Sequence, residues 1–187
     1  TDSFSYLDGM YAFSIYDKRI NKVILARDFF GEKPLYYHET SAAFYWASEL
    51  KSIVNVIDRT GLTLSNTALN LYFQLTYIPA PYTIYENIFK LELNTVLEYN
   101  LQTKKVIQTP IKQQTAKDGY MGISEENAAK ICFEKVYQSV ISRSVADVPL
   151  GTFLSGGVDS SIVSWCLAQN SNQQINTFSI GFENKKI

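Results

Sequence analysis

The sequence is poor in the residue types that mark several classes of protein. Its 187 residues include two cysteines and one histidine, too few for a disulfide scaffold and without the spacing of a zinc site. Basic and acidic side chains nearly balance, 17 against 18, so no polyanion-binding surface is indicated and nucleic acid is not expected as a partner. No apolar run approaches the roughly 20 residues that span a bilayer, and the N-terminus lacks a signal pattern. We expect a cytoplasmic globular protein that does not bind membranes.

Apolar and aromatic side chains are abundant, at 46% and 14% of the residues, which is enough for a sizeable core. We predict that Cys132 and Cys166 are buried free thiols within helices, as expected in a reducing compartment. His38 lies on a predicted strand without a cysteine or a well-placed acid. A surface or hydrogen-bonded role is therefore favoured over catalysis.

Aromatic-rich segments alternate with polar turns in the first part of the chain. The runs MYAFSIYD, KVILARD, PLYYHE and AFYWAS, between residues 10 and 48, predict two adjacent hairpins of one antiparallel sheet. Arg27 and Asp28 open the segment between the hairpins, where we expect a turn fixed by proline and a local ion pair. Short helices are predicted over 49–56 and from Ser65, and VLEYNL with KKVIQ predicts a further hairpin.

A change to Gln, Lys, Thr and Gly in the middle of the chain predicts a linker at 108–123 between domains at 1–107 and 124–187. After the linker, Ser124 precedes two glutamates and a long helical pattern whose apolar stripe includes Cys132. Strands over 150–154 and 175–180, joined by a helix over about 159–169, predict a parallel crossover. The predicted fold class is α+β followed by α/β, the second domain opening a doubly wound sheet.

The stretch GTFLSGGVDSS, residues 151–161, joins the first of these strands to the helix. The pair Gly156 and Gly157 lets the backbone curl so that several N–H groups converge, an arrangement that suits phosphate oxygens. Serine hydroxyls can add donors, but the carboxylate of Asp159 repels a phosphate unless a divalent cation lies between them. The motif therefore predicts a polyphosphate site with magnesium. The alternative is that Asp159 only caps the helix and that the glycines serve an ordinary turn.

The loop is not a Walker A loop, because no lysine follows the glycines. Its SGGxDS form resembles the loop of enzymes that cleave ATP between the α and β phosphates. Further segments resemble, in order and spacing, motifs of the glutamine-hydrolysing asparagine synthase family: LDGMYAFSIYD, LARDFFGEKPLYY, WASELKSIV, LTYIPAPYTIYENIFKL, ADVPLGTFLSGGVDSS and TFSIGFE. The resemblance covers nearly the whole chain.

The resemblance implies the latter part of an αββα Ntn-type glutaminase sandwich, followed by the start of a Rossmann-like ATP-pyrophosphatase domain. It implies ATP-dependent amidation of aspartate through a β-aspartyl adenylate, with ammonia from glutamine. Glutamine, aspartate and ATP are then the small-molecule partners, ATP and Mg²⁺ are the cofactors, and a homodimer is left open. The residues implied to bind the nucleotide are Leu154, Ser155, Gly156, Gly157, Asp159, Ser160 and Ile180, with Asp159 acting through the metal.

The family's glutaminase nucleophile is an N-terminal cysteine, a role that neither cysteine of this sequence can take. Thr1 is rejected as a substitute, because the residues after it match the interior of the family's domain. The family's later synthetase residues are expected beyond Ile187. We therefore expect a fragment that contains no catalytic residue and is inactive alone.

The loop motif leaves the acceptor of the amide group open. A related amidotransferase could act on another carboxylate, such as a sugar acid of a surface polysaccharide, or could be a β-lactam-type synthetase. A non-catalytic nucleotide-binding relative is the alternative from another class.

Overall fold

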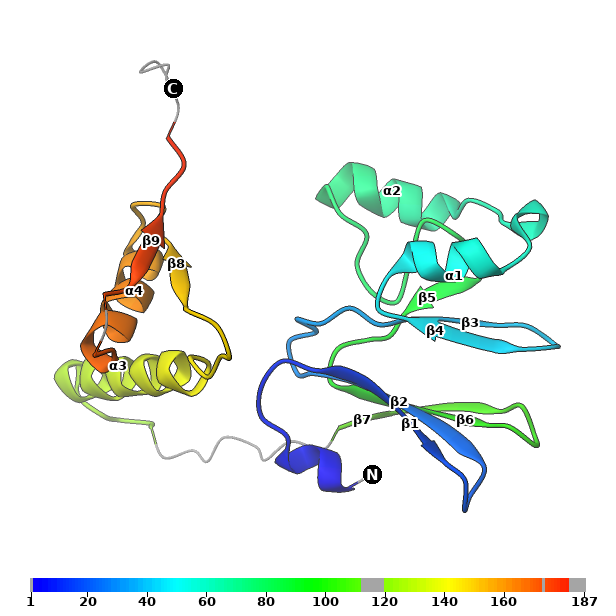
Figure 1. The fold of residues 1–187 in the computed structure, drawn as a ribbon, viewed down its shortest axis with the longest axis horizontal. Helices are drawn as coiled ribbons and strands as arrows, with labels where there is room; N and C mark the ends of the chain where they lie inside the picture. The colour runs from blue at the N-terminus through cyan, green and yellow to red at the C-terminus, as the bar shows by residue number, and fades with distance from the viewer. Residues whose placement is uncertain (1, 112–119, 173, 182–187) are drawn as a thin grey trace. The chain divides into compact units, whose positions relative to one another are not determined.

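The computed structural model describes residues 2–111, 120–172 and 174–181. The chain forms two compact units, Thr1–Thr115 and Ala116–Ile187, and we describe each by itself (Figure 1). The division falls inside the segment predicted as a linker, and the last strand of the first unit also runs into that segment, as far as Pro110. The domain bounds 1–107 and 124–187 stay a prediction.

The first unit contains two antiparallel sheets and two α-helices. Its elements are η1 (Asp2–Tyr6), β1 (Ala12–Asp17), β2 (Lys22–Arg27), β3 (Tyr36–Glu39), β4 (Phe44–Ala47), α1 (Leu50–Val56), η2 (Arg59–Gly61), α2 (Asn66–Leu75), β5 (Ile88–Lys90), β6 (Thr95–Asn100) and β7 (Val106–Pro110). One sheet has the order β1-β2-β6-β7 and the other β4-β3-β5. The three predicted hairpins and both predicted helices are confirmed, and the sequence analysis missed β5.

The two sheets are stacked rather than continuous, so the prediction of one sheet for the first two hairpins is wrong. Hairpin β1–β2 belongs to the four-stranded sheet and hairpin β3–β4 to the three-stranded one. The ring of Phe44 on β4 stacks on that of Tyr99 on β6, with centroids 4.3 Å apart. Each hairpin has an apolar face that must be covered, and facing sheets cover both at once.

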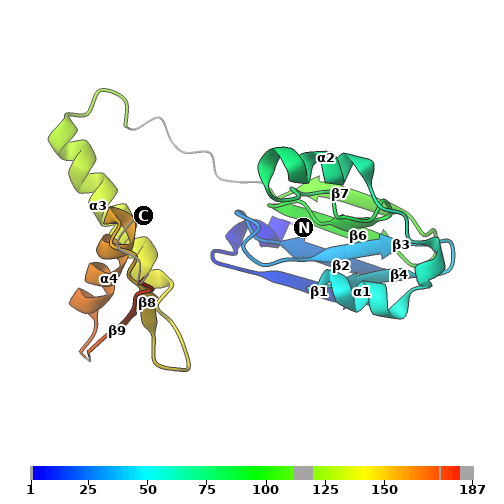
Figure 2. The same ribbon diagram turned by 90° about the horizontal axis from the view of Figure 1, so that it is seen from above.

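The main core lies between these sheets. It combines residues of the first sheet with residues of the second and of its flanking loops: Val23, Leu25, Leu97 and Tyr99 with Leu35, Tyr37 and Leu91. Helices α1 and α2 lie over the outer side of the three-stranded sheet (Figures 1 and 2), where Ile53 of α1 is fully buried. The other face of the four-stranded sheet carries a smaller cluster that includes Phe4 of η1. The described layers are thus helices, sheet and sheet.

The segment between the hairpins is held by Arg27 and Asp28, both buried. The Arg27 guanidinium donates from Nε to the carbonyl of Lys33 at 2.9 Å, and its other nitrogens donate to the carbonyls of Gly31 and Leu91. The Asp28 carboxylate accepts from the backbone N–H groups of Glu32 and Lys33 at 2.8 and 3.0 Å. The predicted turn is confirmed. The predicted local ion pair is not, because the side chains of Arg27 and Asp28 bond to the backbone and neither forms an ion pair with a described residue.

Gly31 fits this turn for two reasons. Its φ is +63°, a region that side-chain-bearing residues avoid. A Cβ there would also lie 2.8 Å from Nη2 of Arg27. The buried guanidinium thus dictates the glycine.

Asp28→Asn is expected to lower stability by about 1–3 kcal/mol at neutral pH, because the amide cannot accept both backbone N–H groups. Burial acts to raise the pKa of Asp28, but the backbone hydrogen bonds outweigh it and hold the pKa below its usual 3.8. A depressed pKa means that the contribution of the carboxylate is present above pH 3.8 and is lost as the pH falls toward the lowered value. Urea unfolding of both proteins from pH 7 to pH 3 should show the difference shrinking. A constant difference would contradict this.

The second unit contains α3 (Glu125–Ser142), β8 (Gly151–Phe153), α4 (Val158–Asn170) and β9 (Asn176–Phe178). Strands β8 and β9 pair with each other in parallel, and the crossover helix α4 connects them, as predicted. Ser124 caps α3 by accepting from the N–H of Asn127, which is also as predicted. No helix within the described ranges is long and apolar enough to cross a membrane.

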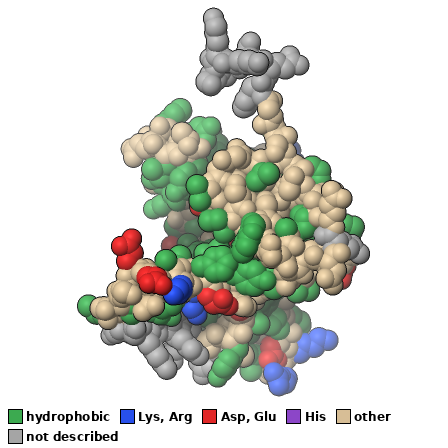
Figure 3. Space-filling view, turned by 90° about the vertical axis from the view of Figure 1, so that its left-hand side faces the viewer, with side chains coloured by type: hydrophobic (Ala, Val, Ile, Leu, Met, Phe, Trp, Pro, Cys, Tyr) green, Lys and Arg blue, Asp and Glu red, His purple; other side chains and the backbone are tan. Residues whose placement is uncertain are grey.

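Helix α3 packs on α4 through part of the predicted apolar stripe, which consists of Ala129, Cys132, Phe133, Val136 and Val140. The ring of Phe133 lies 5.6 Å from that of Trp165 on α4, and Tyr137, Val140 and Ile141 are half-buried. Cys132 is exposed, so the prediction of a buried thiol is wrong for it, whereas Cys166 is buried as predicted. Cys132 lies at the edge of the stripe and outside the face that meets α4. Hydrophobic side chains reach the surface of this unit (Figure 3). By their exposed fractions, Phe133 and Trp165 are about half exposed.

Candidate functional site

The loop predicted to bind phosphate lies at the carboxyl ends of two parallel strands. It follows β8, and its first residue, Leu154, donates its N–H to the carbonyl of Phe178 at the end of β9 at 2.8 Å. The hydroxyl of Ser179 donates in turn to the carbonyl of Leu154 at 2.6 Å. In open α/β sheets this edge, where helix N-termini also point, is where ligands bind. Leu154 is half-buried, whereas Ile180 is 86% exposed and lies two residues beyond β9.

The two glycines of the loop have different roles. Gly156 has φ +85°, and a Cβ at this residue would meet no atom within 4 Å, so the glycine is needed for its conformation and not for space. Gly157 is the N-cap of α4 and makes no side-chain cap bond. The first N–H groups of a helix have no partner within the helix. The loop therefore brings free donors to the sheet edge.

Three serines lie at this turn. Ser160 accepts from the N–H of Ser155 at 3.3 Å, and the two hydroxyls lie 3.1 Å apart. The hydroxyls of Ser160 and Ser161 both donate to the carbonyl of Gly157, at 3.1 and 2.8 Å. The fold thus brings Ser155 and Ser160 together, and it bonds the hydroxyls of Ser160 and Ser161 to the same carbonyl at the start of α4.

Asp159 lies in the first turn of α4 and is exposed. The alternative that it caps the helix is not supported by a cap bond, because Gly157 occupies the N-cap. An acidic side chain in the first turn still interacts favourably with the helix dipole. No group of three or more His, Cys, Asp or Glu side chains suited to a metal is found among the described residues.

A hollow of about 490 Å³ adjoins the loop on the side of α3. Its lining joins the loop to the facing surfaces of the two helices: Gly156, Gly157, Val158, Ser161, Ile162, Phe133 and Trp165. The volume is in the range of small-molecule sites. The sequence analysis did not find this aromatic wall, because Phe133 and Trp165 lie far apart along the chain.

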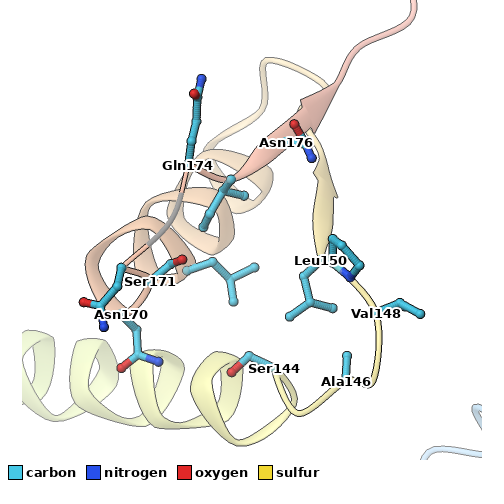
Figure 4. A pocket seen from close by; sticks show the side chains of 12 residues that line it. Ser144, Ala146, Val148, Leu150, Asn170, Ser171, Gln174 and Asn176 are labelled. Atoms are coloured by element: carbon cyan, nitrogen blue, oxygen red, sulfur yellow. The ribbon is translucent and has the colours of Figure 1, made fainter.

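A second hollow, of about 510 Å³, lies at the opposite end of the strands (Figure 4). Residues just before β8 and β9, such as Leu150, and the end of α4, such as Asn170, line it. It therefore opens at the amino ends of the strands, away from the loop. The rule for open α/β sheets favours the loop edge over this hollow.

The remaining candidates for catalysis have structural partners. The Nδ1 atom of His38 lies 2.6 Å from the carbonyl oxygen of Asn87, which can only accept, so Nδ1 carries the proton. The His38 ring also stacks on that of Tyr45, with the centroids 6.0 Å apart. The bond to Asn87 agrees with the predicted hydrogen-bonded role of His38. Both cysteines belong to the second unit. Thr1 lies outside the described residues.

Comparison with known proteins divides the chain near the boundary between its two units. Residues 1–110 match the family model described as a glutamine amidotransferase domain, and residues 133–187 match the model described as asparagine synthase. The chain is similar to putative asparagine synthetase (glutamine-hydrolysing) 2 of Methanocaldococcus jannaschii, with 36% identity over 98% of this chain and 36% of that protein.

Two proteins of Bacillus subtilis are also similar. Asparagine synthetase (glutamine-hydrolysing) 1 is 33% identical over 96% of this chain and 27% of its own length. Asparagine synthetase (glutamine-hydrolysing) 2 is 30% identical over 92% of this chain and 24% of its own length. The chain thus spans about a quarter to a third of the length of these curated relatives.

Proposed function

Because the chain belongs to the glutamine amidotransferase family, with an asparagine synthase segment following that domain, we propose that the protein is a glutamine-hydrolysing asparagine synthase. It would convert aspartate, glutamine and ATP to asparagine, glutamate, AMP and pyrophosphate. The observation that carries the proposal is the loop after β8, where Gly156 has a positive φ and α4 begins without a side-chain cap. Free N–H groups at the carboxyl edge of a parallel pair suit the phosphates of a nucleotide.

The proposal extends to the fold of both units. We assign the first unit to an αββα glutaminase sandwich, supported by its two stacked antiparallel sheets and one layer of helices. We assign the second to the start of a Rossmann-like ATP-pyrophosphatase domain, supported by the parallel crossover β8–α4–β9. Such an enzyme uses ATP and aspartate, both of which are available in the cytoplasm, and we propose that location for it.

In this proposal the loop holds the phosphates of ATP. The backbone at Gly156 and Gly157 supplies N–H donors. The hydroxyls of Ser155 and Ser160, which lie 3.1 Å apart, supply the side-chain donors, that of Ser160 after it leaves the carbonyl of Gly157. Leu154 and Ile180 follow the two strands, and we propose that they contact the adenosine part. The exposure of Ile180 leaves its side chain free to do so.

The residues at the loop also fit a magnesium ion. Mg²⁺ keeps several waters and is commonly held by one or two carboxylates together with substrate phosphates. Asp159 is an exposed carboxylate in the first turn of α4, so it can be that ligand while the phosphates supply others. When bound, the ion would neutralise charge on the departing pyrophosphate.

The chemistry explains why two units are needed. A carboxylate is a poor electrophile until one of its oxygens is part of a good leaving group. The aspartate side chain attacks the α-phosphorus of ATP, pyrophosphate leaves, and ammonia then displaces AMP from the acyl carbon. Ammonia protonates in bulk water at neutral pH and loses its nucleophilic lone pair, so its release from glutamine must be sheltered from solvent. The resemblance implies a cysteine as the nucleophile of glutamine hydrolysis, and neither Cys132 nor Cys166 lies in the first unit.

Exchange of labelled pyrophosphate into ATP tests the acid that is activated. The full-length protein should catalyse this exchange with magnesium and aspartate, and should do so at background rate without an acid. Glutamate, whose side-chain carboxylate is one methylene further away, and succinate, which keeps the spacing but lacks the α-amino group, are the controls. Exchange that requires a sugar acid, or does not depend on aspartate, would exclude asparagine synthesis. ATP binding without exchange for any of these acids would favour the non-catalytic nucleotide-binding relative.

A further inference from the structure

Thr152 is a buried hydroxyl in the middle of β8. Thr152 is 8% exposed, and among the described residues of the second unit no other polar residue is buried. A buried hydroxyl costs free energy unless it is hydrogen-bonded. Valine has the same shape and favours strands at least as well. The hydroxyl of Thr152 is therefore not needed for shape or for the strand, and its role depends on the hydrogen bond that it forms.

The partner is Ser164 on α4. The two hydroxyl oxygens lie 2.9 Å apart, and Ser164 Oγ also donates to the carbonyl of Ser160 at 2.8 Å. A hydroxyl has one proton. Since that of Ser164 is used on Ser160, Thr152 must donate to Ser164. The bonds form a directed chain from the middle of the strand to the first turn of the helix.

This chain ends on a residue of the proposed nucleotide site. The Ser160 carbonyl receives the bond from Ser164, while its side chain accepts from the N–H of Ser155. The other end of the loop is tied separately, because Leu154 is bonded to Phe178 and Ser179 beside β9. The loop is thus fixed at both ends, and the hydroxyl pair holds the helical end.

We propose that Thr152 and Ser164 are positioning residues of the nucleotide site, acting through Ser160 to set the first turn of α4 against β8. The inference rests on the proposed function, because it concerns the same loop. Neither side chain needs to touch the nucleotide. The hydroxyl pair would keep the loop donors at the spacing of the phosphates and so limit the reorganisation required when ATP binds.

Thr152→Val tests this in the full-length protein, since it removes the hydroxyl and keeps the shape. We expect the KM for ATP in pyrophosphate exchange to rise about fivefold, which is the effect of one hydrogen bond. The KM for aspartate and the rate of glutamine hydrolysis should stay unchanged. Thr152→Ser should restore the KM for ATP to within about twofold, because it restores the donor.

Ser164→Ala is a second variant, and together with Thr152→Val it allows a double-mutant cycle. Because both hydroxyls belong to the same series of hydrogen bonds, the double variant should raise the KM for ATP no further than the stronger single variant. If the two single effects on the KM for ATP add in the double variant, the two hydroxyls act independently and the proposed coupling is wrong. Ser142→Ala is the matched control, since its hydroxyl also donates to a backbone carbonyl of its own helix, that of Ser139, but lies on α3.

The outcomes separate this inference from the proposed function. If Thr152→Val lowers the melting temperature but leaves the KM for ATP unchanged, the pair is only structural and the inference fails. The proposed function survives in that case if Asp159→Ala still abolishes exchange. If neither Thr152→Val nor Asp159→Ala changes ATP kinetics, the loop is not the nucleotide site and both proposals fail.

Discussion

Asp159→Ala in the full-length protein should lower ATP–pyrophosphate exchange by at least about a hundredfold. Removing a single group that stabilises charge in a transition state commonly has an effect of this size. Asp159 is an exposed first-turn carboxylate, and it belongs to no group of three or more His, Cys, Asp or Glu side chains suited to a metal among the described residues. Its loss would leave a magnesium–pyrophosphate unit without its protein carboxylate. Glutamine hydrolysis, assigned to the other unit, should be largely retained.

Two further variants make the test on Asp159 decisive. Asp159→Asn keeps an oxygen but removes the charge, so it should also lose most of the exchange activity. Glu125→Gln removes the same charge from the first turn of α3 and should leave exchange unchanged. A carboxylate that only interacts with the helix dipole contributes about 0.3–1 kcal/mol to stability. If Asp159→Ala keeps its exchange activity and loses only a little stability, Asp159 interacts with the helix dipole and does not bind the metal.

Arg27→Leu should lower the stability of the first unit by about 3–5 kcal/mol, an exceptionally large effect for one substitution. The buried guanidinium satisfies the carbonyls of Gly31, Lys33 and Leu91. Leucine can bond none of them. The bond to Leu91 is buried, and the loss of a buried partner costs about 1–3 kcal/mol. The bonds to Gly31 and Lys33 are partly buried, so their loss costs less and adds to that of Leu91. These carbonyls lie in the connections between the two stacked sheets, so the sandwich itself should loosen.

The melting temperature of the full-length protein measures this loss, and we expect a fall of roughly 10 °C. Arg19→Leu is the matched control, because Arg19 pairs with Asp17 at an exposed hairpin turn. It should shift the melting temperature by no more than about 2 °C. Equal shifts for the two variants would mean that the bonds of Arg27 do not hold the turn.

The local elements could be predicted because their causes are local. Alternating apolar residues indicated the hairpins β1–β2, β3–β4 and β6–β7, since side chains of a strand point to opposite faces. Ser65 and Ser124 marked the starts of α2 and α3, because a serine hydroxyl accepts from the free N–H groups of a first turn. The parallel crossover β8–α4–β9 was predicted from the spacing of its parts.

Partners distant in sequence could not be predicted in the same way. The alternation of apolar and polar residues shows which face of a hairpin is apolar, but it does not show which other surface covers that face. For this reason the first two hairpins were wrongly predicted to lie in one sheet. Cys132 lies at the edge of an apolar stripe, and only the packing of α3 on α4 shows that it is exposed. The short strand β5 was missed because three residues carry too little pattern.

The sequence by itself determined where the loop after β8 lies and which residue types it contains, because a strand, a pair of glycines and a helix start are all written within eleven consecutive residues. Only the tertiary structure decided what those residues contact. It placed the hydroxyls of Ser155 and Ser160 3.1 Å apart, directed those of Ser160 and Ser161 to the carbonyl of Gly157, and linked Ser164 to Thr152. The physical reason is that a hydrogen bond depends on distance and direction in space, which are set by packing between elements and not by position along the chain.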